Sequence, residues 1–132
     1  MKTIKSKDNT TYKLAVKLTK KKYRDETGLY LLEGVKPLED ALALGIKLKT
    51  IFLCEGTQRA EPLPEDICMV TDRKLFEKLS DTGTSQGVIA IAEKNTCTFA
   101  EFAEAAAEGS GNVVIMDRLQ DPGNIGTIIR TA

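Results

Sequence analysis

The chain has 132 residues, with 19 Lys and Arg, 19 Asp and Glu and no His, so its formal net charge is zero. One compact domain of ordinary size fits this length, and the lack of His excludes a Ser-His-Asp triad and a His-ligated metal site. The longest unbroken apolar run has five residues, too few for a membrane-spanning helix. Three cysteines without a close pair indicate neither a disulfide framework nor a zinc site, and they favour a reducing, cytoplasmic setting.

The zero net charge hides two segments of opposite sign. Residues 1–24 carry nine Lys and Arg against one acid, a net charge of +8, and residues 25–132 carry ten Lys and Arg against eighteen acids, a net charge of −8. A strongly basic segment is typical of a chain with a polyanionic partner such as nucleic acid. The alternative is a solvated, lysine-rich helix that serves solubility, and charge alone does not choose between the two.

The first predicted helix lies in this basic segment and runs from about residue 9 to residue 22. Four side chains recur at three- and four-residue spacing and are expected to face the core: Tyr12, Ala15, Val16 and Thr19. Basic side chains recur at similar spacing on another face: Lys13, Lys17, Lys20 and Arg24. A basic stripe beside an apolar one predicts a helix that docks on a core with its cations facing solvent.

Strands and helices alternate along the rest of the chain. Short, mainly apolar runs predict strands over 29–33, 50–54, 67–70, 88–92 and 112–117. Capping residues and periodic apolar positions predict helices over 37–44, 72–79, 98–108 and 124–132. Because the strands are nearly all apolar and alternate with helices, the sequence predicts an α/β fold with a mainly parallel sheet.

The segment 116–132 is the most informative part of the sequence. A predicted buried strand ends in Asp117, a tight loop spans 121–123, and a helix is expected to begin at Asn124. A helix N-terminus at the carboxyl end of a strand is suited to binding an anion, although an ordinary strand–turn–helix connection has the same pattern. Arg130 lies off the predicted buried stripe and is free to reach a phosphate or a carboxylate. That stripe consists of Ile125, Ile128 and Ile129.

Asp121-Pro-Gly-Asn-Ile-Gly126, followed by Ile-Ile-Arg130-Thr-Ala132, resembles the first signature motif of the SpoU (TrmH) RNA 2′-O-methyltransferases of the SPOUT superfamily. Three N-terminal pieces are similar to the start of that family's substrate-binding domain: Ile4-Lys-Ser6, Lys22-Tyr-Arg24 and Gly28-Leu-Tyr-Leu-Leu-Glu33-Gly34. Gln86-Gly87-Val88 resembles a segment near the end of that domain. The pieces occur in the family's order and span nearly the whole chain.

The resemblance implies an enzyme that transfers a methyl group from S-adenosylmethionine to a ribose 2′-hydroxyl, with ribosomal RNA as the expected substrate and transfer RNA as the second choice. It implies that residues 1–108 form an RNA-binding domain, a three-layer α/β/α sandwich like certain RNA-binding ribosomal proteins. Residues 109–132 are then the start of a knotted methyltransferase domain, which in this family binds the cofactor and dimerises. No membrane partner and no metal are expected.

The resemblance also implies roles for single residues. Asn124 matches the motif asparagine of the catalytic pocket, and Arg130 matches the motif arginine implicated in activating the ribose hydroxyl. The cations expected to bind RNA are Lys5, Lys13, Lys17, Lys20, Lys21 and Arg24. Glu33 is expected to be structural, whereas Gln86 and Gly87 fit either a turn or an RNA contact.

Because the later family motifs, which supply the knot and the cofactor loops, are absent from this sequence, we expect a fragment of a homodimeric parent that by itself neither binds S-adenosylmethionine nor methylates RNA. Two other hypotheses remain. The first is a non-enzymatic RNA- or ribosome-binding module that uses the same basic helix. The second is an α/β domain that binds a small phosphate compound through residues 121–126, which leaves the basic segment unexplained.

Overall fold

The computed structural model describes residues 1–58, 63–81, 85–109 and 113–131. Contacts within the chain divide it into two compact units, Met1–Asn95 and Thr96–Ala132, and each is described by itself. This division assigns helix α5 (Phe99–Glu108) to the second unit. A functional boundary between residues 108 and 109 stays a prediction.

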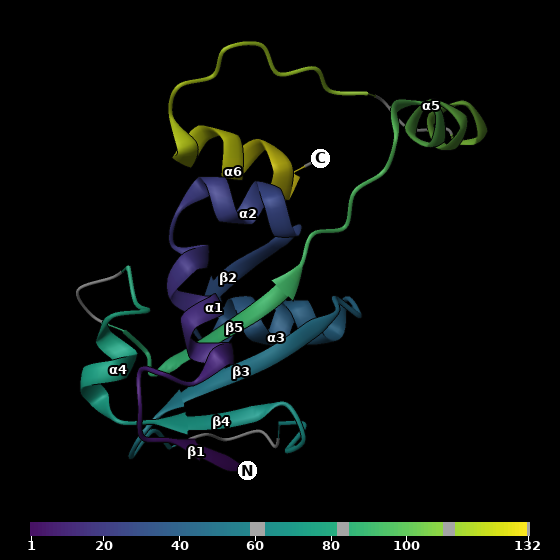
Figure 1. The fold of residues 1–132 in the computed structure, drawn as a ribbon. Coiled ribbons are helices and arrows are strands. Elements are labelled where there is room, and N and C mark those ends of the chain that lie inside the picture. Colours follow the sequence, from purple (N-terminus) through teal and green to yellow (C-terminus); the bar gives the residue numbers. More distant parts are fainter. Residues whose placement is uncertain (59–62, 82–84, 110–112, 132) are drawn as a thin grey trace. The chain divides into compact units, whose positions relative to one another are not determined.

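The first unit is built on one five-stranded sheet in the order β1-β4-β3-β5-β2 (Figure 1). The strands are β1 (Lys2–Ile4), β2 (Leu29–Glu33), β3 (Leu48–Cys54), β4 (Cys68–Thr71) and β5 (Val88–Glu93). Four of them lie where the sequence predicts strands, and β1 was not expected. β1, β4 and β3 run parallel, but β5 is antiparallel to both β3 and β2. The sheet is therefore mixed, and the prediction of a mainly parallel sheet is correct for only one half of it.

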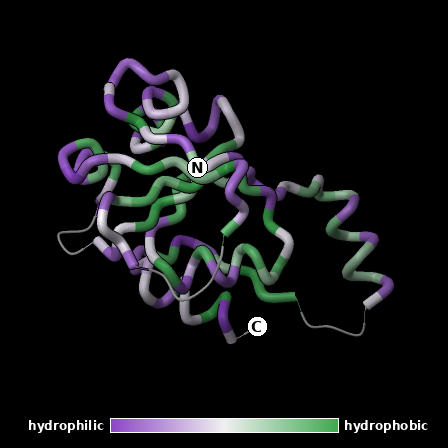
Figure 2. Tube along the Cα trace, turned by 90° about the horizontal axis from the view of Figure 1, so that it is seen from below, coloured by the Kyte–Doolittle hydropathy of each residue, from purple (hydrophilic) through white to green (hydrophobic). Residues whose placement is uncertain are grey.

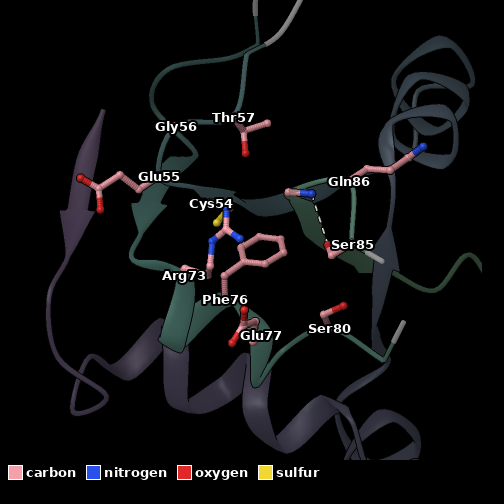
Figure 3. Close-up of a pocket in the computed structure, with 11 residues that line it drawn as sticks. Cys54, Glu55, Gly56, Thr57, Arg73, Phe76, Glu77, Ser80, Ser85 and Gln86 are labelled. Atoms are coloured by element: carbon pink, nitrogen blue, oxygen red, sulfur yellow. Dashed lines mark hydrogen bonds between the residues drawn. The ribbon is translucent and has the colours of Figure 1, made fainter. Parts of the chain in front are cut away.

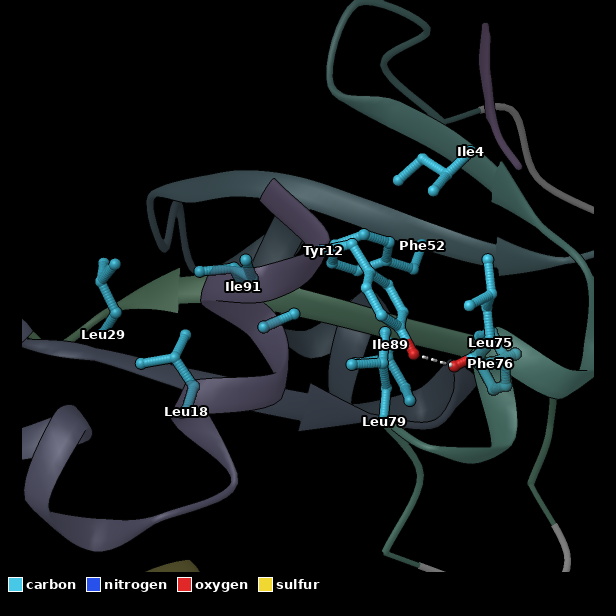
Figure 4. Packing of buried hydrophobic residues seen from close by; sticks show 11 residues of the cluster. Ile4, Tyr12, Leu18, Leu29, Phe52, Leu75, Phe76, Leu79, Ile89 and Ile91 are labelled. Atoms are coloured by element: carbon cyan, nitrogen blue, oxygen red, sulfur yellow. Dashed lines mark hydrogen bonds between the residues drawn. The ribbon is translucent and has the colours of Figure 1, made fainter. Parts of the chain in front are cut away.

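Helices cover both faces of this sheet. Alternate residues of a strand point to opposite faces, so β3 directs Phe52 to one side and Ile51 and Leu53 to the other. Phe52 packs in a core cluster with α1 (Thr10–Leu18) and α4 (Arg73–Glu77), shown in Figure 4, while Ile51 and Leu53 pack with α3 (Val35–Ala43). Figure 2 shows hydrophobic residues along the central strands. These two clusters confirm the predicted three-layer α/β/α sandwich.

The predicted basic helix is two helices, α1 and α2 (Lys21–Thr27). The buried face of α1 follows the three-residue spacing of Tyr12, Ala15 and Leu18. The expectation that Val16 and Thr19 face the core is wrong, because Val16 is 38% exposed and Thr19 is exposed at the end of α1. A helix of only nine residues presents one narrow stripe to a sheet, and Leu18, the last residue of α1, completes that stripe.

Helix ends are set by residues that satisfy the free backbone groups. The Asn9 side chain accepts a hydrogen bond from the Tyr12 amide at 3.0 Å and so begins α1. In the same way, the Asp72 side chain accepts a hydrogen bond from the Leu75 amide at 2.8 Å and begins α4. Gly45, with φ +66°, ends α3 as predicted, because its own amide and the amide of Ile46 turn back to carbonyls of the last turn at 3.2 and 2.8 Å. These caps fix where each helix meets the sheet.

The second unit contains α5 and α6 (Pro122–Thr131). The predicted capping box of α5 is confirmed, with Thr98 and Glu101 bonded to each other's backbone amides. The predicted strand 112–117 is wrong where the structure describes it: residues 113–117 form no strand, and Ile115 is 87% exposed. A strand requires a neighbour for its amides and carbonyls, and no described segment pairs with this one.

Helix α6 begins at Pro122, two residues before the predicted start, because the Asp121 carboxylate accepts a hydrogen bond from the Gly123 amide at 2.9 Å. The predicted buried stripe of this helix is wrong. Ile129 is 63% exposed, and Ile125 and Ile128 are only half-buried. Residue 132, the last position of the motif, lies outside the described residues.

Tyr12→Phe tests the contact between α1 and α4. The Tyr12 hydroxyl donates to the Leu75 carbonyl at 2.9 Å in the interior, and burial raises the pKa of this hydroxyl. Removing the hydroxyl leaves a buried carbonyl near the end of a short helix without its donor, so we expect a loss of about 1–2 kcal/mol in the free energy of unfolding in urea. Tyr30→Phe, at a half-buried tyrosine of β2, is the control and should change it by less than about 0.5 kcal/mol. Equal effects would contradict the role of the Tyr12 hydroxyl.

Candidate functional site

One edge of the sheet collects the ends of most strands. The register pairs Ile4 with Thr71 and Cys54 with Thr71, so β1, β4 and β3 end together. β2 also ends there, and the antiparallel β5 begins there, because Glu33 is paired with Ile89. We call this side of the sheet the carboxyl edge. Ligands of α/β proteins bind at the carboxyl ends of strands, so this edge is the first place to look for a site.

A groove of about 760 Å³ lies at the carboxyl edge (Figure 3). Its walls are the turn after β3, helix α4 with Ser80, and residues 85–87, which lead into β5. The Arg73 guanidinium and the Phe76 ring point toward the middle of the groove, whereas the side chains of Glu55 and Gln86 point away from it. Sequence reasoning missed Arg73 as a site residue, because only the strand register shows which loops meet at one edge.

Gln86 turns away from the groove because it caps α3. Its Oε1 accepts a hydrogen bond from the Val35 amide at 2.8 Å, at the start of a helix whose N-cap residue, Gly34, has no side chain to do so. A Cβ at Gly34 would approach this Oε1 to 3.0 Å, and φ at Gly34 is +107°. The motif residues Gly34 and Gln86 therefore have a structural role: Gln86 caps α3 from a distant segment, and Gly34 leaves the space for its carboxamide.

Glu33 also has structural contacts. Its carboxylate accepts hydrogen bonds from the Ser80 hydroxyl and, at 3.0 Å, from the Asp81 amide. These bonds tie the segment after α4 to the end of β2. The expectation of a structural role for Glu33 agrees with this geometry.

The predicted RNA-binding cations do not form one patch. Lys5 follows β1 at the carboxyl edge, whereas Lys20 and Lys21 lie beyond the other end of α1, a nine-residue helix about 14 Å long. Lys13 and Lys17 lie between them and are exposed, four residues apart on one side of α1. We call Lys13, Lys17, Lys20 and Lys21 the basic ridge.

Arg24 is turned toward the protein. Its Nη1 donates to the carbonyl oxygens of Leu18 and Thr19 at 3.0 and 2.8 Å and so caps the end of α1. A cation at this position also complements the negative end of the helix dipole. Arg24 therefore joins α1 to α2, and its guanidinium is already occupied by two carbonyl groups.

Acidic partners reduce the charge of the basic segment. Lys13 pairs with Asp8 at 2.8 Å, and Lys21 pairs with Asp25 at 3.0 Å. Hydrogen bonds from Lys94 and Lys21 hold the pKa of Asp25 below its ordinary value. Lys17 lies 5.7 Å from the centre of the Tyr23 ring, a cation–π distance. Counting Asp25 and Glu26 with the segment, residues 1–26 carry nine Lys and Arg against three acids, a net charge of +6.

The terminal motif lies in α6, where Asn124 and Arg130 are both exposed. The Arg130 guanidinium folds back along the helix: its Nη2 lies 3.5 Å from the Thr127 hydroxyl, and a Cβ at Gly126 would lie 3.2 Å from its Nη1. No described contact joins Asn124 to Arg130. The segment 113–131 has no buried side chain, so these residues do not by themselves enclose a small molecule.

Other kinds of site find no support in the described part of the chain. No three His, Cys, Asp or Glu side chains come together there as metal ligands. Cys54, Cys68 and Cys97 form no disulfide in the described part of the chain. Among the described helices, none is both long and apolar enough to cross a membrane.

The chain is similar to several known proteins over most of its length. The MRM3-like substrate binding domain model matches residues 9–90. The 23S rRNA (guanosine(2553)-2′-O)-methyltransferase RlmP of Bacillus subtilis is 35% identical over 133 residues, which cover 100% of this chain and 50% of RlmP. An AdoMet-bound rRNA methyltransferase from Sinorhizobium meliloti superposes with a TM-score of 0.58 at 28% identity, over 73% of this chain and 38% of that one.

A crystal structure of an RNA 2′-O ribose methyltransferase superposes with a TM-score of 0.66 over 98% of this chain and 50% of that one, at 24% identity, which shows a shared fold. The class that these matches define is the substrate-binding part of SpoU (TrmH)-type RNA methyltransferases. The chain belongs to the MRM3-like substrate binding domain family through residues 9–90. It spans about half the length of RlmP.

Gln86→Ala tests the cap on α3. The substitution removes the acceptor of the Val35 amide, and we expect the free energy of unfolding to fall by about 0.5–2 kcal/mol, the usual cost of losing an N-cap. Gln120→Ala is the matched control, because Gln120 is exposed in the segment before α6, and it should leave unfolding unchanged. Chemical denaturation followed by circular dichroism measures both. A stable Gln86→Ala variant would show that α3 does not depend on this cap.

Proposed function

We propose that this chain holds RNA for a ribose 2′-O-methyltransferase, and that the RNA is ribosomal. The observation that carries the proposal is the similarity to RlmP, because it extends over 100% of this chain and so includes both the basic N-terminal segment and the terminal motif. In the whole protein, the methyl group of S-adenosylmethionine passes to a ribose 2′-hydroxyl. The first unit contributes RNA affinity and orientation.

The basic ridge is the surface that we assign to the RNA backbone. Its four lysines project from α1 and from the start of α2, away from the buried side chains Tyr12 and Leu18. Phosphate contacts of this kind supply affinity without sequence preference and weaken as salt rises. Lys5 can add a contact at the carboxyl edge. Arg24, which is held by two carbonyl groups, supports the ridge as a structural residue.

S-adenosylmethionine is the methyl donor in this proposal, and its sulfonium supplies the methyl cation equivalent when bound. The described residues do not form its pocket, because every side chain of 113–131 is exposed or half-buried. We therefore assign no binding step to this chain and place the cofactor site in the whole protein. An AdoMet-bound structural relative supports this choice of donor.

Asn124 and Arg130 are the residues that we assign to the catalytic pocket of the whole protein. A ribose hydroxyl is a very weak acid, and an arginine stays protonated in proteins, so Arg130 is a poor base. It can instead stabilise the developing alkoxide by charge, with an RNA phosphate taking part. Gly126 suits this role, because its missing side chain leaves space for the guanidinium beside the helix.

Two further parts of the proposal concern the setting. We propose that the whole protein is a homodimer through its methyltransferase domain, as the family resemblance implies. We propose a cytoplasmic location, which fits three cysteines that form no disulfide in the described part of the chain.

A second candidate function is a non-enzymatic RNA-binding module. The observation in its favour is that Met1–Asn95 is a compact unit with its own two-sided core and the whole basic ridge, so RNA binding needs nothing from the second unit. Methyl-transfer assays on the whole protein distinguish this candidate from the enzyme.

Reversing the charge of the ridge tests RNA binding. We expect Lys13→Glu/Lys17→Glu to weaken the affinity of this chain for structured ribosomal RNA by tenfold or more and to lower the salt slope of log K by about 1–2. Lys36→Glu/Lys47→Glu changes the net charge equally at two exposed lysines, which pair with Asp40 and Glu93 as Lys13 pairs with Asp8. Fluorescence anisotropy at several salt concentrations measures both pairs. Equal losses in the two variants would place the RNA elsewhere.

Arg130→Ala tests the catalytic assignment in the whole protein. Because Arg130 is exposed and contributes no core contact, the variant should keep its fold and its binding of S-adenosylmethionine, measured by calorimetry, while methyl transfer to RNA falls at least a hundredfold. Thr131→Ala, at the neighbouring exposed position, is the control. Full activity of Arg130→Ala would remove this residue from the catalytic pocket.

A further inference from the structure

The groove at the carboxyl edge contains an arginine that the proposed function does not use. The Arg73 guanidinium points toward the middle of the groove (Figure 3). Among the described residues, no carboxylate forms an ion pair with it. The Arg24 guanidinium, by contrast, donates hydrogen bonds to two backbone carbonyls. Arg73 therefore presents a planar, charged group inside a concavity.

The surroundings of Arg73 fit a flat polar molecule better than a phosphate. Beside it lies the Phe76 ring, which is only 2% exposed and forms an apolar wall of the groove. The hydroxyl groups of Thr57 and Ser85 line the rim, and Glu77 lines the groove from α4. Two acidic residues, Glu55 and Glu77, line the groove against the single charge of Arg73, so the groove has no excess positive charge to hold an anion. Neutral rings with polar edges, such as nucleobases, match an arginine plane with hydroxyl and carboxylate groups around it.

Cations for the RNA backbone lie beside the groove and outside it. β1 ends at the same edge, because Ile4 is paired with Thr71, two residues before Arg73. Lys5 and Lys7 follow β1 and are exposed. Since β1 is two strands from β3, these lysines start about 10 Å from the turn that forms the far wall of the groove. An RNA strand can thus place phosphates on Lys5 and Lys7 while one of its bases enters the groove.

We propose that the carboxyl-edge groove receives an unpaired nucleobase of the bound RNA, which stacks on the Arg73 guanidinium and meets the polar side chains of the rim with its edge. This inference rests on the proposed RNA-binding function and deepens it. The basic ridge holds the backbone of any RNA, whereas the groove selects RNAs that offer a base outside a helix. Arg73 is thereby a specificity residue, because only a base that is not already stacked inside an RNA helix can stack on its guanidinium.

The test compares two RNA hairpins that differ by one bulged nucleotide, titrated against the full 132-residue chain. We expect the bulged hairpin to bind about tenfold more tightly, in line with the usual contribution of one stacked base. Arg73→Ala should remove this preference while both hairpins keep their ridge-dependent binding. Arg73→Lys, which keeps the charge and loses the plane, should restore little of it. Lys74→Ala is the matched control, since Lys74 is exposed on the same helix and does not line the groove.

A fluorescent base in the bulge reports stacking directly. With 2-aminopurine at that position, binding to the native chain should change its emission as it stacks in the groove, and binding to Arg73→Ala should leave the emission close to that of the free RNA. Equal affinity for the two hairpins, or full recovery of the preference by Arg73→Lys, would overturn the proposal and make Arg73 a phosphate contact. If neither hairpin bound in a salt-dependent manner, the RNA-binding function itself would fail, which is a separate result.

Discussion

The pairing of β3 with a parallel strand on one side and an antiparallel strand on the other is the constraint on which the molecule depends. Parallel pairing with β4 brings the turn after β3 beside Arg73, and antiparallel pairing with β5 brings residues 85–87 to the same edge. Phe52 and Ile51 point from this strand into the two cores. One strand thus organises both the packing of the first unit and the position of its groove.

The charges of the basic segment serve several purposes, and only geometry separates them. Arg24 caps a helix, Lys21 pairs with Asp25, and Lys17 lies against an aromatic ring. An exposed ion pair contributes little to stability, so a lysine in such a pair can exchange its acid for a phosphate at small cost. Arg24 cannot exchange its partners for a phosphate in this way, because the two carbonyl groups at the end of α1 would then lose their donor. The ridge and its structural support are therefore different residues of one sequence segment.

Much of the fold follows from the sequence, because buried strands and capped helices have strong local signals. The strand ending at Glu33, the cap at Asp72 and the stop at Gly45 all lie where local patterns predict them. Strand direction has no local signal, since an apolar run has the same composition in either orientation, and so the reversal of β5 was not predicted. The groove was missed for the same reason: Arg73 and Thr57 come together only through the register. The segment 113–117 shows the opposite failure, a strong strand pattern with no described partner to bond.

The cap that Gln86 places on α3 links two positions 52 residues apart by a shared volume. A side chain at position 34 would need the space that the Gln86 carboxamide fills, and a shorter side chain at position 86 would leave the start of α3 without an acceptor. A change at either position therefore has a cost that is felt at the other end of this contact. At position 34 the positive φ adds to this demand for space, so a side chain there is strained even if position 86 is shortened. The start of α3 is thus defined jointly by a backbone conformation at one position and by a carboxamide that comes from the far end of the sheet-forming segment.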